Sequence, residues 1–322
     1  MADALQASLS GIYPRSEEHV EATRGLERQR VTPQECEAVR VEDAKAVVKL
    51  QGLSKFALTT DGQLNWQDLF RPFVEACEGL EAGALTRWFD NNTFYRKPVV
   101  SGELTLHDGL PHEFFRARVI DGAPWKVVLP GPYTFARAAE ETGTKAKRAQ
   151  HIEQFADFIR LAARWCADRG AKRLQFSEPW LVYEKPPRAD LEATEAAYET
   201  ITKGLKAETV VFPYFGDLAK IYPAVLDLPV NGIGIDLTAT DLTELEAHAF
   251  DKGALLGAVD GRNSLVETSD EILFQVRQAV DLLEPDWVSI APSCELELCP
   301  RPVADRKVGA LGEASARWRD DQ

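Results

Sequence analysis

The sequence is short of several features that define whole classes of protein. Its 322 residues include only five cysteines, scattered at Cys36, Cys77, Cys166, Cys294 and Cys299. An odd, scattered set does not suggest a disulfide framework, so we interpret these residues as reduced thiols. No apolar run approaches the roughly 18 residues needed to cross a bilayer, and the first residues lack the basic and apolar regions of a signal peptide. We therefore predict a cytoplasmic protein with no membrane partner.

Positive charge is also scarce. Lysine and arginine number 37 against 51 aspartates and glutamates, which gives a formal net charge of −14. Non-specific binding to nucleic acid requires a cationic face, so we expect no nucleic-acid partner. The apolar fraction of 45% and the charged fraction of 27% are ordinary for a globular protein. With no low-complexity segment and no linker, the sequence predicts a single domain over residues 1–322.

Short apolar runs separated by helical patterns recur along the chain. Nearly continuous apolar runs are typical of parallel strands that are buried on both faces. Repeated strand–helix units of this length favour a β/α barrel or a doubly wound sheet, and the count of eight strands favours the barrel. The eight predicted strands are Leu9–Pro14, Phe56–Thr60, Lys126–Leu129, Arg173–Glu178, Thr209–Tyr214, Asn231–Asp236, Ala254–Asp260 and Trp287–Ala291.

Helices and one interruption complete the expected architecture. Thr32-Pro33 is a good helix start, with Thr32 as N-cap, and this helix should run to about Leu50. Further helices are predicted over 65–77, 144–169 and 216–226. Residues 84–124 break the pattern and suggest a β-hairpin inserted after the second strand–helix unit. The fold class predicted is α/β: a single (β/α)8 TIM barrel with this insertion.

Polar residues gather where the predicted strands end. In a β/α barrel the site lies at the C-terminal ends of the strands, so these residues should converge. For Asp61 and Asp260 a helix cap or turn is an alternative role, and Glu178 has the alternative of a buried structural carboxylate. The candidate binding residues at these ends are Arg15, Asp61, Glu178, Tyr214, Asp236, Asp260, Arg262, Asn263 and Cys294.

The same strand ends carry a resemblance to a known family. The segments Ser10-Gly-Ile-Tyr-Pro-Arg15, Phe176-Ser-Glu-Pro179, Val259-Asp-Gly-Arg-Asn263 and Pro292-Ser-Cys294, with Thr60-Asp-Gly62 and Leu129-Pro-Gly-Pro132, resemble the strand-end motifs of cobalamin-independent methionine synthase. That family belongs to the uroporphyrinogen-decarboxylase-like barrels. The segments Tyr214-Phe-Gly216, Gly232–Leu237 and Arg87–Asn92 resemble the amino-terminal barrel of the two-barrel enzyme. The resemblance covers nearly the whole chain.

The resemblance also implies a zinc site that this chain does not reproduce. The catalytic barrel of the family holds zinc through a His-x-Cys pair, a Glu and a distant Cys. Here the corresponding positions are Phe212-Pro-Tyr214, Asp236 and Cys294. One carboxylate and one thiol do not make a zinc site, which needs three or four good ligands. We therefore expect no intrinsic metal or cofactor, and we expect the zinc on a partner barrel.

The resemblance further implies that basic residues meet the glutamate tail of a folate. Arg15 and Arg87 match basic positions of the family, and arginine suits carboxylates through paired hydrogen bonds. Arg87 could instead be an ordinary surface residue. Beside it, Trp88 belongs to an aromatic cluster that could stack on a pterin but more simply covers the barrel mouth.

Two functions of different classes follow. The first is methyl transfer from a folate-type donor to homocysteine, in which this chain contributes donor binding beside a zinc-bearing, methionine-synthase-like partner. Its small-molecule ligand would be a methylated pterin or folate, or a homocysteine-like compound. The second is a non-catalytic binding or scaffold barrel derived from the amino-terminal domain of that enzyme.

Overall fold

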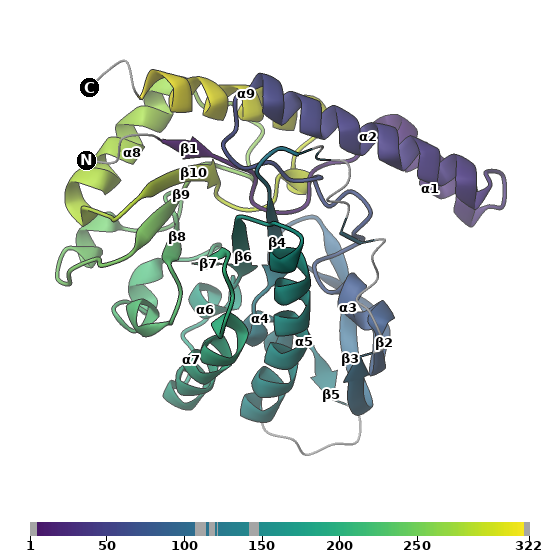
Figure 1. Cartoon of the computed structure of the whole chain (residues 1–322), viewed down its shortest axis with the longest axis horizontal. Helices are drawn as coiled ribbons and strands as arrows, with labels where there is room; N and C mark the ends of the chain where they lie inside the picture. The colour runs from purple at the N-terminus through teal and green to yellow at the C-terminus, as the bar shows by residue number, and fades with distance from the viewer. Residues whose placement is uncertain (1–4, 107–113, 116–119, 121, 142–147, 319–322) are drawn as a thin grey trace.

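The computed structural model describes residues 5–106, 114, 115, 120, 122–141 and 148–318. Its main sheet has seven parallel strands in the order β1-β10-β9-β8-β7-β6-β4. Figure 1 shows these strands curling about the centre of the molecule, with helices on the outside. The strands are β1 Gln6–Ala7, β4 Lys126–Pro130, β6 Arg173–Ser177, β7 Glu208–Phe212, β8 Gly232–Asp236, β9 Gly253–Val259 and β10 Val288–Pro292.

The last six strands of this sheet lie within one or two residues of their predicted positions. Every residue of β4, β6, β8, β9 and β10 is buried. A strand covered on both faces favours an apolar run, and most of these strands have one, although Lys126 of β4 and Arg173 and Gln175 of β6 are polar and buried. The architecture is an α/β fold with a curled, parallel sheet.

The two predicted strands nearest the N-terminus differ from the structure. β1 ends at Ala7, and the segment predicted as a strand, Leu9–Pro14, lies outside the sheet; Gly11 within it has a φ of +126°. The predicted strand over 56–60 is reduced to a single bridge between Thr59 and Trp125. Even so, Ala57 N–H donates to Ala7 O at 3.1 Å, and Thr59 N–H donates to Pro124 O at 2.9 Å. This segment therefore lies between the two edge strands of the sheet, β1 and β4.

The described helices are of two kinds, long outer helices and short helices near the strand ends. The helix predicted from Thr32 is α2, and Thr32 and Glu35 form its capping box. The helix predicted over 144–169 is α5, and residues 144–147 lie outside the described part. The α-helices are α1 Glu17–Glu27, α2 Pro33–Leu53, α3 Arg71–Ala76, α4 Pro132–Ala138, α5 Arg148–Asp168, α6 Trp180–Tyr183, α7 Arg188–Thr202, α8 Ser269–Leu283 and α9 Arg301–Arg317.

Two helix predictions were wrong. In the range 65–77 only α3 is helical, and the Asp68 carboxylate stabilises the turn before it by accepting hydrogen bonds from Phe70 N–H and Arg71 N–H. The range 216–226 contains two short 3₁₀ helices, η2 Leu218–Lys220 and η3 Ala224–Asp227. Pro223 lacks the N–H that a continuous α-helix would need there.

A second, smaller sheet stands beside the first. β2 (Cys77–Arg87) pairs antiparallel with β3 (Phe94–Leu106), and β5 (Glu140–Glu141) adds to β3. The pairing starts before residue 84, where the predicted hairpin began, and most of the predicted range after Leu106 lies outside the described residues. The turn that joins β2 and β3, residues 88–93, reaches the C-terminal ends of the main strands. Within the described part of the chain, no helix is long and apolar enough to cross a membrane.

Candidate functional site at the mouth of the barrel

The C-terminal ends of the strands surround one small cavity. The loops after β7 and β10 and the 88–93 turn converge on it. Its volume is about 20 Å³, which is room for one group about the size of a water molecule. No lysine, arginine or histidine of the described chain lines it. The side chains that dominate its lining are Asp68, Trp88, Tyr95, Tyr214, Glu295 and Glu297.

Glu295 is the centre of the hydrogen bonds in this mouth. The Trp88 indole Nε1–H donates to Glu295 Oε1 at 2.8 Å. The Tyr214 hydroxyl also hydrogen-bonds to Glu295 and to Ser177. Burial raises the pKa of the Glu295 carboxyl above its ordinary value, although the bonds from Tyr214 and Trp88 oppose the rise. Two predicted site residues, Trp88 and Tyr214, thus meet on an acid that the sequence analysis missed.

Glu297 is a second acid at the same mouth. Burial, and then the neighbouring Glu295 carboxylate, raise its pKa to about 8, while Arg15 opposes this shift. Its backbone N–H donates to Ile12 O at 3.0 Å and fixes the turn after β10. The only signal that could have revealed these two acids is their position directly after the predicted strand-end residue Cys294.

Aromatic rings cover the mouth. Trp88 is only 4% exposed, and its ring centroid lies 5.3 Å from that of Tyr95 and 5.6 Å from that of Trp180. The ring centroid of Phe89 lies 4.4 Å from that of Trp180 and 5.2 Å from that of Phe215. Phe89 and Phe215 both have positive φ, +53° and +67°, a conformation that is strained for bulky residues and is concentrated at functional sites. The 88–93 turn is therefore held over the cavity by aromatic contacts.

The buried Glu178 carboxylate stabilises the fold through hydrogen bonds. Its carboxylate accepts hydrogen bonds from Tyr133 N–H at 3.1 Å, Thr134 N–H at 2.7 Å and the Tyr198 hydroxyl at 3.2 Å. Burial raises its pKa to about 7 in spite of these donors. A Cβ on Gly131 would lie 2.1 Å from the Glu178 carboxyl carbon, so glycine is needed for this approach. The carboxylate ties β6 to the start of α4.

The acids predicted after the other strands also accept hydrogen bonds that stabilise turns. Asp236 is buried and accepts hydrogen bonds from Phe215 N–H at 3.1 Å and from the Thr238 hydroxyl at 2.6 Å. Asp260 accepts from Arg262 N–H at 2.8 Å. In the same way, Asn263 Oδ1 accepts from Leu265 N–H, and Asp61 Oδ1 accepts from Gln63 N–H.

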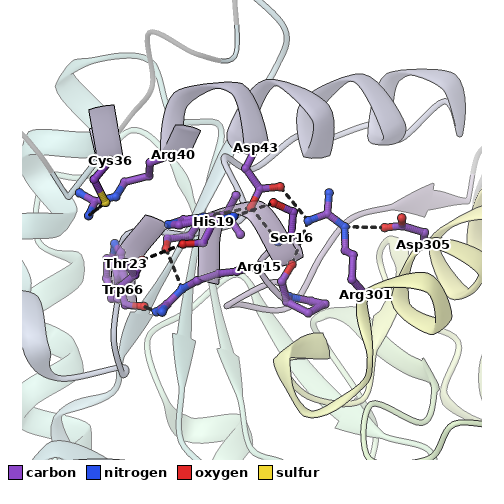
Figure 2. A network of polar contacts seen from close by, with 12 residues as sticks. Arg15, Ser16, His19, Thr23, Cys36, Arg40, Asp43, Trp66, Arg301 and Asp305 are labelled. Atoms are coloured by element: carbon purple, nitrogen blue, oxygen red, sulfur yellow. Dashed lines mark hydrogen bonds and ion pairs between the residues drawn. The ribbon is translucent and has the colours of Figure 1, made fainter. Parts of the chain in front are cut away.

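Arg15 and Arg87 have different surroundings. Arg15 donates to Leu64 O at 3.1 Å and Trp66 O at 2.7 Å, so its guanidinium holds a neighbouring loop (Figure 2). Arg87 is exposed on β2, with its guanidinium 5.5 Å from the centroid of the Phe94 ring. The exposed Arg262 has its guanidinium 5.3 Å from the centroid of the Phe215 ring.

The loop that carries Arg15 is anchored by a buried polar network that sequence reasoning did not find. Asp43 on α2 accepts hydrogen bonds from Ser16 N–H, from His19 Nδ1 at 3.0 Å and from Arg301 at 2.9 Å (Figure 2). Burial opposes its ionisation, but these donors lower the pKa of Asp43 to about 2. The network joins α1, α2 and α9 behind the mouth, where it has a supporting role.

The donor set at the mouth does not suit zinc. Phe212 and Tyr214 stand where the family resemblance requires an imidazole and a thiolate, and the Asp236 carboxylate already accepts the hydrogen bonds described above. Burial, followed by the nearby Glu295 carboxylate, raises the pKa of the Cys294 thiol well above its ordinary value, which disfavours the thiolate that zinc binds. No group of three or more candidate metal ligands occurs among the described residues.

The curled parallel sheet, with its polar groups at the C-terminal strand ends, defines a TIM-barrel-like protein whose candidate site lies at the barrel mouth. The sequence profile described as "Cobalamin-independent synthase, N-terminal domain" matches residues 55–283. The chain therefore belongs to the cobalamin-independent methionine synthase family.

Individual relatives agree with this assignment. The chain is 25% identical to a methionine synthase of Saccharolobus islandicus over 98% of this chain and 96% of that protein. It is 30% identical to the 5-methyltetrahydropteroyltriglutamate–homocysteine methyltransferase of Herpetosiphon aurantiacus over 70% of this chain but only 30% of that protein.

Among solved structures, the fold is similar to a B12-independent methionine synthase from Shewanella sp. W3-18-1 in complex with selenomethionine. The TM-score is 0.78 at 18% identity, with 99% of this chain and 98% of that chain covered. A putative vitamin-B12-independent methionine synthase from Listeria monocytogenes gives a TM-score of 0.77 at 14% identity, with 99% of each chain covered. These likenesses concern the fold.

Proposed function

We propose that this chain binds the methyl donor in methyl transfer from a folate-type compound to homocysteine, and that it works beside a zinc-bearing, methionine-synthase-like partner barrel. The observation that carries the proposal is the combination of family membership with a mouth whose residues do not suit zinc. Phe212 and Tyr214 stand where the family resemblance places nitrogen and sulfur ligands, while polar and aromatic side chains line the mouth.

Donor binding is supported by the charge at the rim. Arg87 and Arg262 are both exposed next to aromatic rings, Phe94 and Phe215. A pterin with a polyglutamate tail carries a flat ring and several carboxylates, which suit these two kinds of group. The Arg15 guanidinium already donates hydrogen bonds to backbone carbonyls. The anionic tail would therefore bind Arg87 in preference to Arg15.

Calorimetric titration with 5-methyltetrahydropteroyltriglutamate tests donor binding. Each charge-assisted hydrogen bond contributes about 1.5–3 kcal/mol, so Arg87→Ala should weaken binding by about tenfold or more. Arg188→Ala is the matched control, because Arg188 is an exposed arginine on α7 that pairs with Glu192. Equal affinities of the wild type and Arg87→Ala, or no binding by either, would contradict donor binding at this rim.

A second candidate function, a non-catalytic scaffold barrel, is favoured by the small size of the cavity. At about 20 Å³ the mouth holds no pterin unless the 88–93 turn moves. A scaffold would bind the partner barrel but not the donor, so the same titration separates the two functions.

A further inference from the structure

A groove lies between α7 and the segment that carries η2 and η3. Its volume is about 390 Å³, and a cavity of about 150 Å³ already holds a benzene-sized group. The groove therefore has room for more than one apolar side chain. No described residue lines both this groove and the cavity at the mouth, so binding here does not require the methyl transfer proposed above.

The groove lies where a β/α barrel usually has an outer helix. Each strand of that architecture is followed by a helix that covers the outside of the sheet. Between β7 and β8 the described chain forms only η2 and η3, whereas α7, which precedes β7, packs against α5 on the outside of the sheet (Figure 1). We attribute the groove to this missing outer helix.

The deep part of the groove is apolar. Its lining includes four side chains that are at most 5% exposed: Leu181, Ile221, Val225 and Leu228. Leu191 of α7, which is partly buried, adds to this surface. An apolar side chain placed in the groove would therefore be removed from water on several sides, which favours its binding.

The exposed edge of the groove is acidic. Glu192 Oε1 lies 2.8 Å from the Nε of Arg188, so the charge of this base is already compensated. Glu195 on α7 and Asp227 at the end of η3 are exposed, and neither carboxylate has a hydrogen bond or ion pair within the described part of the chain. The edge thus carries two carboxylates without a compensating charge.

We propose that this groove binds an amphipathic helix of a partner protein, which places apolar side chains in the groove and lysine or arginine beside Glu195 and Asp227. Leu191 and Glu195 are one turn apart on α7, so the groove extends along this helix and a second helix can lie beside it. The acidic edge selects a basic helix. A second copy of this chain is a poor occupant, because both copies carry a net charge of −14.

Synthetic peptides test the chemistry of the groove on the full chain. The probe is a fluorescein-labelled amphipathic helix of about 14 residues, roughly four turns, with leucine on one face and lysine on the other. One comparison peptide replaces every lysine by glutamate, and a second has the composition of the lysine peptide in scrambled order. Fluorescence anisotropy should show saturable binding of the lysine peptide, about tenfold tighter than either comparison and weaker at high salt.

Three variants locate the binding. Ala224 is exposed and lines the groove, so Ala224→Lys places a bulky cation there and should abolish binding of the lysine peptide. Glu195→Lys should weaken that binding by about fivefold or more, and it should bind the glutamate peptide more tightly than the wild type does. Glu153→Lys, at an exposed acid on α5, makes the same change in net charge and should behave as the wild type.

Equal affinities for all three peptides, no binding by the wild type, or wild-type affinity in an Ala224→Lys protein that melts at the wild-type temperature would overturn the proposal. A dimer of this chain in sedimentation velocity that Ala224→Lys dissociates would assign the groove to a second copy and would also overturn it. Tighter binding of the glutamate peptide by Glu195→Lys, without the same change in Glu153→Lys, would support the proposal, because a variant that fails to fold cannot gain a ligand.

Discussion

The bond between Trp88 and Glu295 joins the 88–93 turn to the loop after β10, and its energy can be measured by a double-mutant cycle. Trp88→Phe removes the donor and leaves Glu295, which is 8% exposed, without one of its partners. Leaving a buried polar group unsatisfied costs about 1–3 kcal/mol. Glu295→Met removes the acceptor at similar volume and leaves the Trp88 N–H unsatisfied, at a similar cost, while the Tyr214 hydroxyl keeps its hydrogen bond to Ser177.

The double variant lacks both members of the pair, so it should be destabilised by less than the sum of the single variants. We expect a coupling free energy of about 1–2 kcal/mol, within the range found for contacting pairs. Urea unfolding followed by circular dichroism measures each free energy of unfolding, and the slope with urea should stay constant. Trp88→Phe combined with Glu153→Gln is the control pair, and their changes in the free energy of unfolding should add. Additivity of Trp88→Phe with Glu295→Met to within about 0.5 kcal/mol would refute the hydrogen bond as a link between the two loops.

Two further predictions concern Glu178. Burial raises the pKa of Glu178 to about 7, well above its ordinary value, so the folded state binds this proton more tightly than the unfolded state. The contribution of Glu178 to stability therefore falls as pH rises from about 4.5 to about 7. Glu178→Gln should reduce the difference between the urea midpoints at pH 5 and pH 8, and an unchanged difference would contradict the assignment. Gly131→Ala should lower the free energy of unfolding by about 1–3 kcal/mol, since the new Cβ overlaps the Glu178 carboxyl group. Gly309→Ala, where no atom lies within 4 Å of the new Cβ, should keep or raise stability.

The strands from Lys126 onward could be predicted because most are short, nearly continuous apolar runs, although β6 also buries the polar Arg173, Gln175 and Ser177. The segment after Ala7 could not, since Leu9 and Ile12 are buried without belonging to the sheet. Burial there reflects packing at the mouth, which apolar composition alone does not distinguish from a strand.

The sequence predicted where the candidate site lies better than it predicted which residues line it. The predicted strand-end residue Tyr214 lines the cavity at the mouth, and so does Trp88. Glu295 was missed because it follows the strand-end motif by one residue, and its partner Trp88 comes from a turn that is far away in sequence. From sequence alone, a ligand-binding role and a turn-forming role were equally consistent with Asp236, Asp260 and Asn263. The structure shows that each side chain accepts a hydrogen bond from a backbone N–H group.

The central claim, that this chain supplies donor binding to a zinc-bearing partner, is tested most directly by reconstitution. Transfer of a labelled methyl group from 5-methyltetrahydropteroyltriglutamate to homocysteine is measured with this chain alone, with a zinc-bearing homologous barrel from the same genome alone, and with both. The account predicts no transfer by this chain alone and a saturable rise in the partner's rate as this chain is added. Turnover by this chain alone in chelator-treated buffer, or a partner rate that does not change on its addition, would contradict the account.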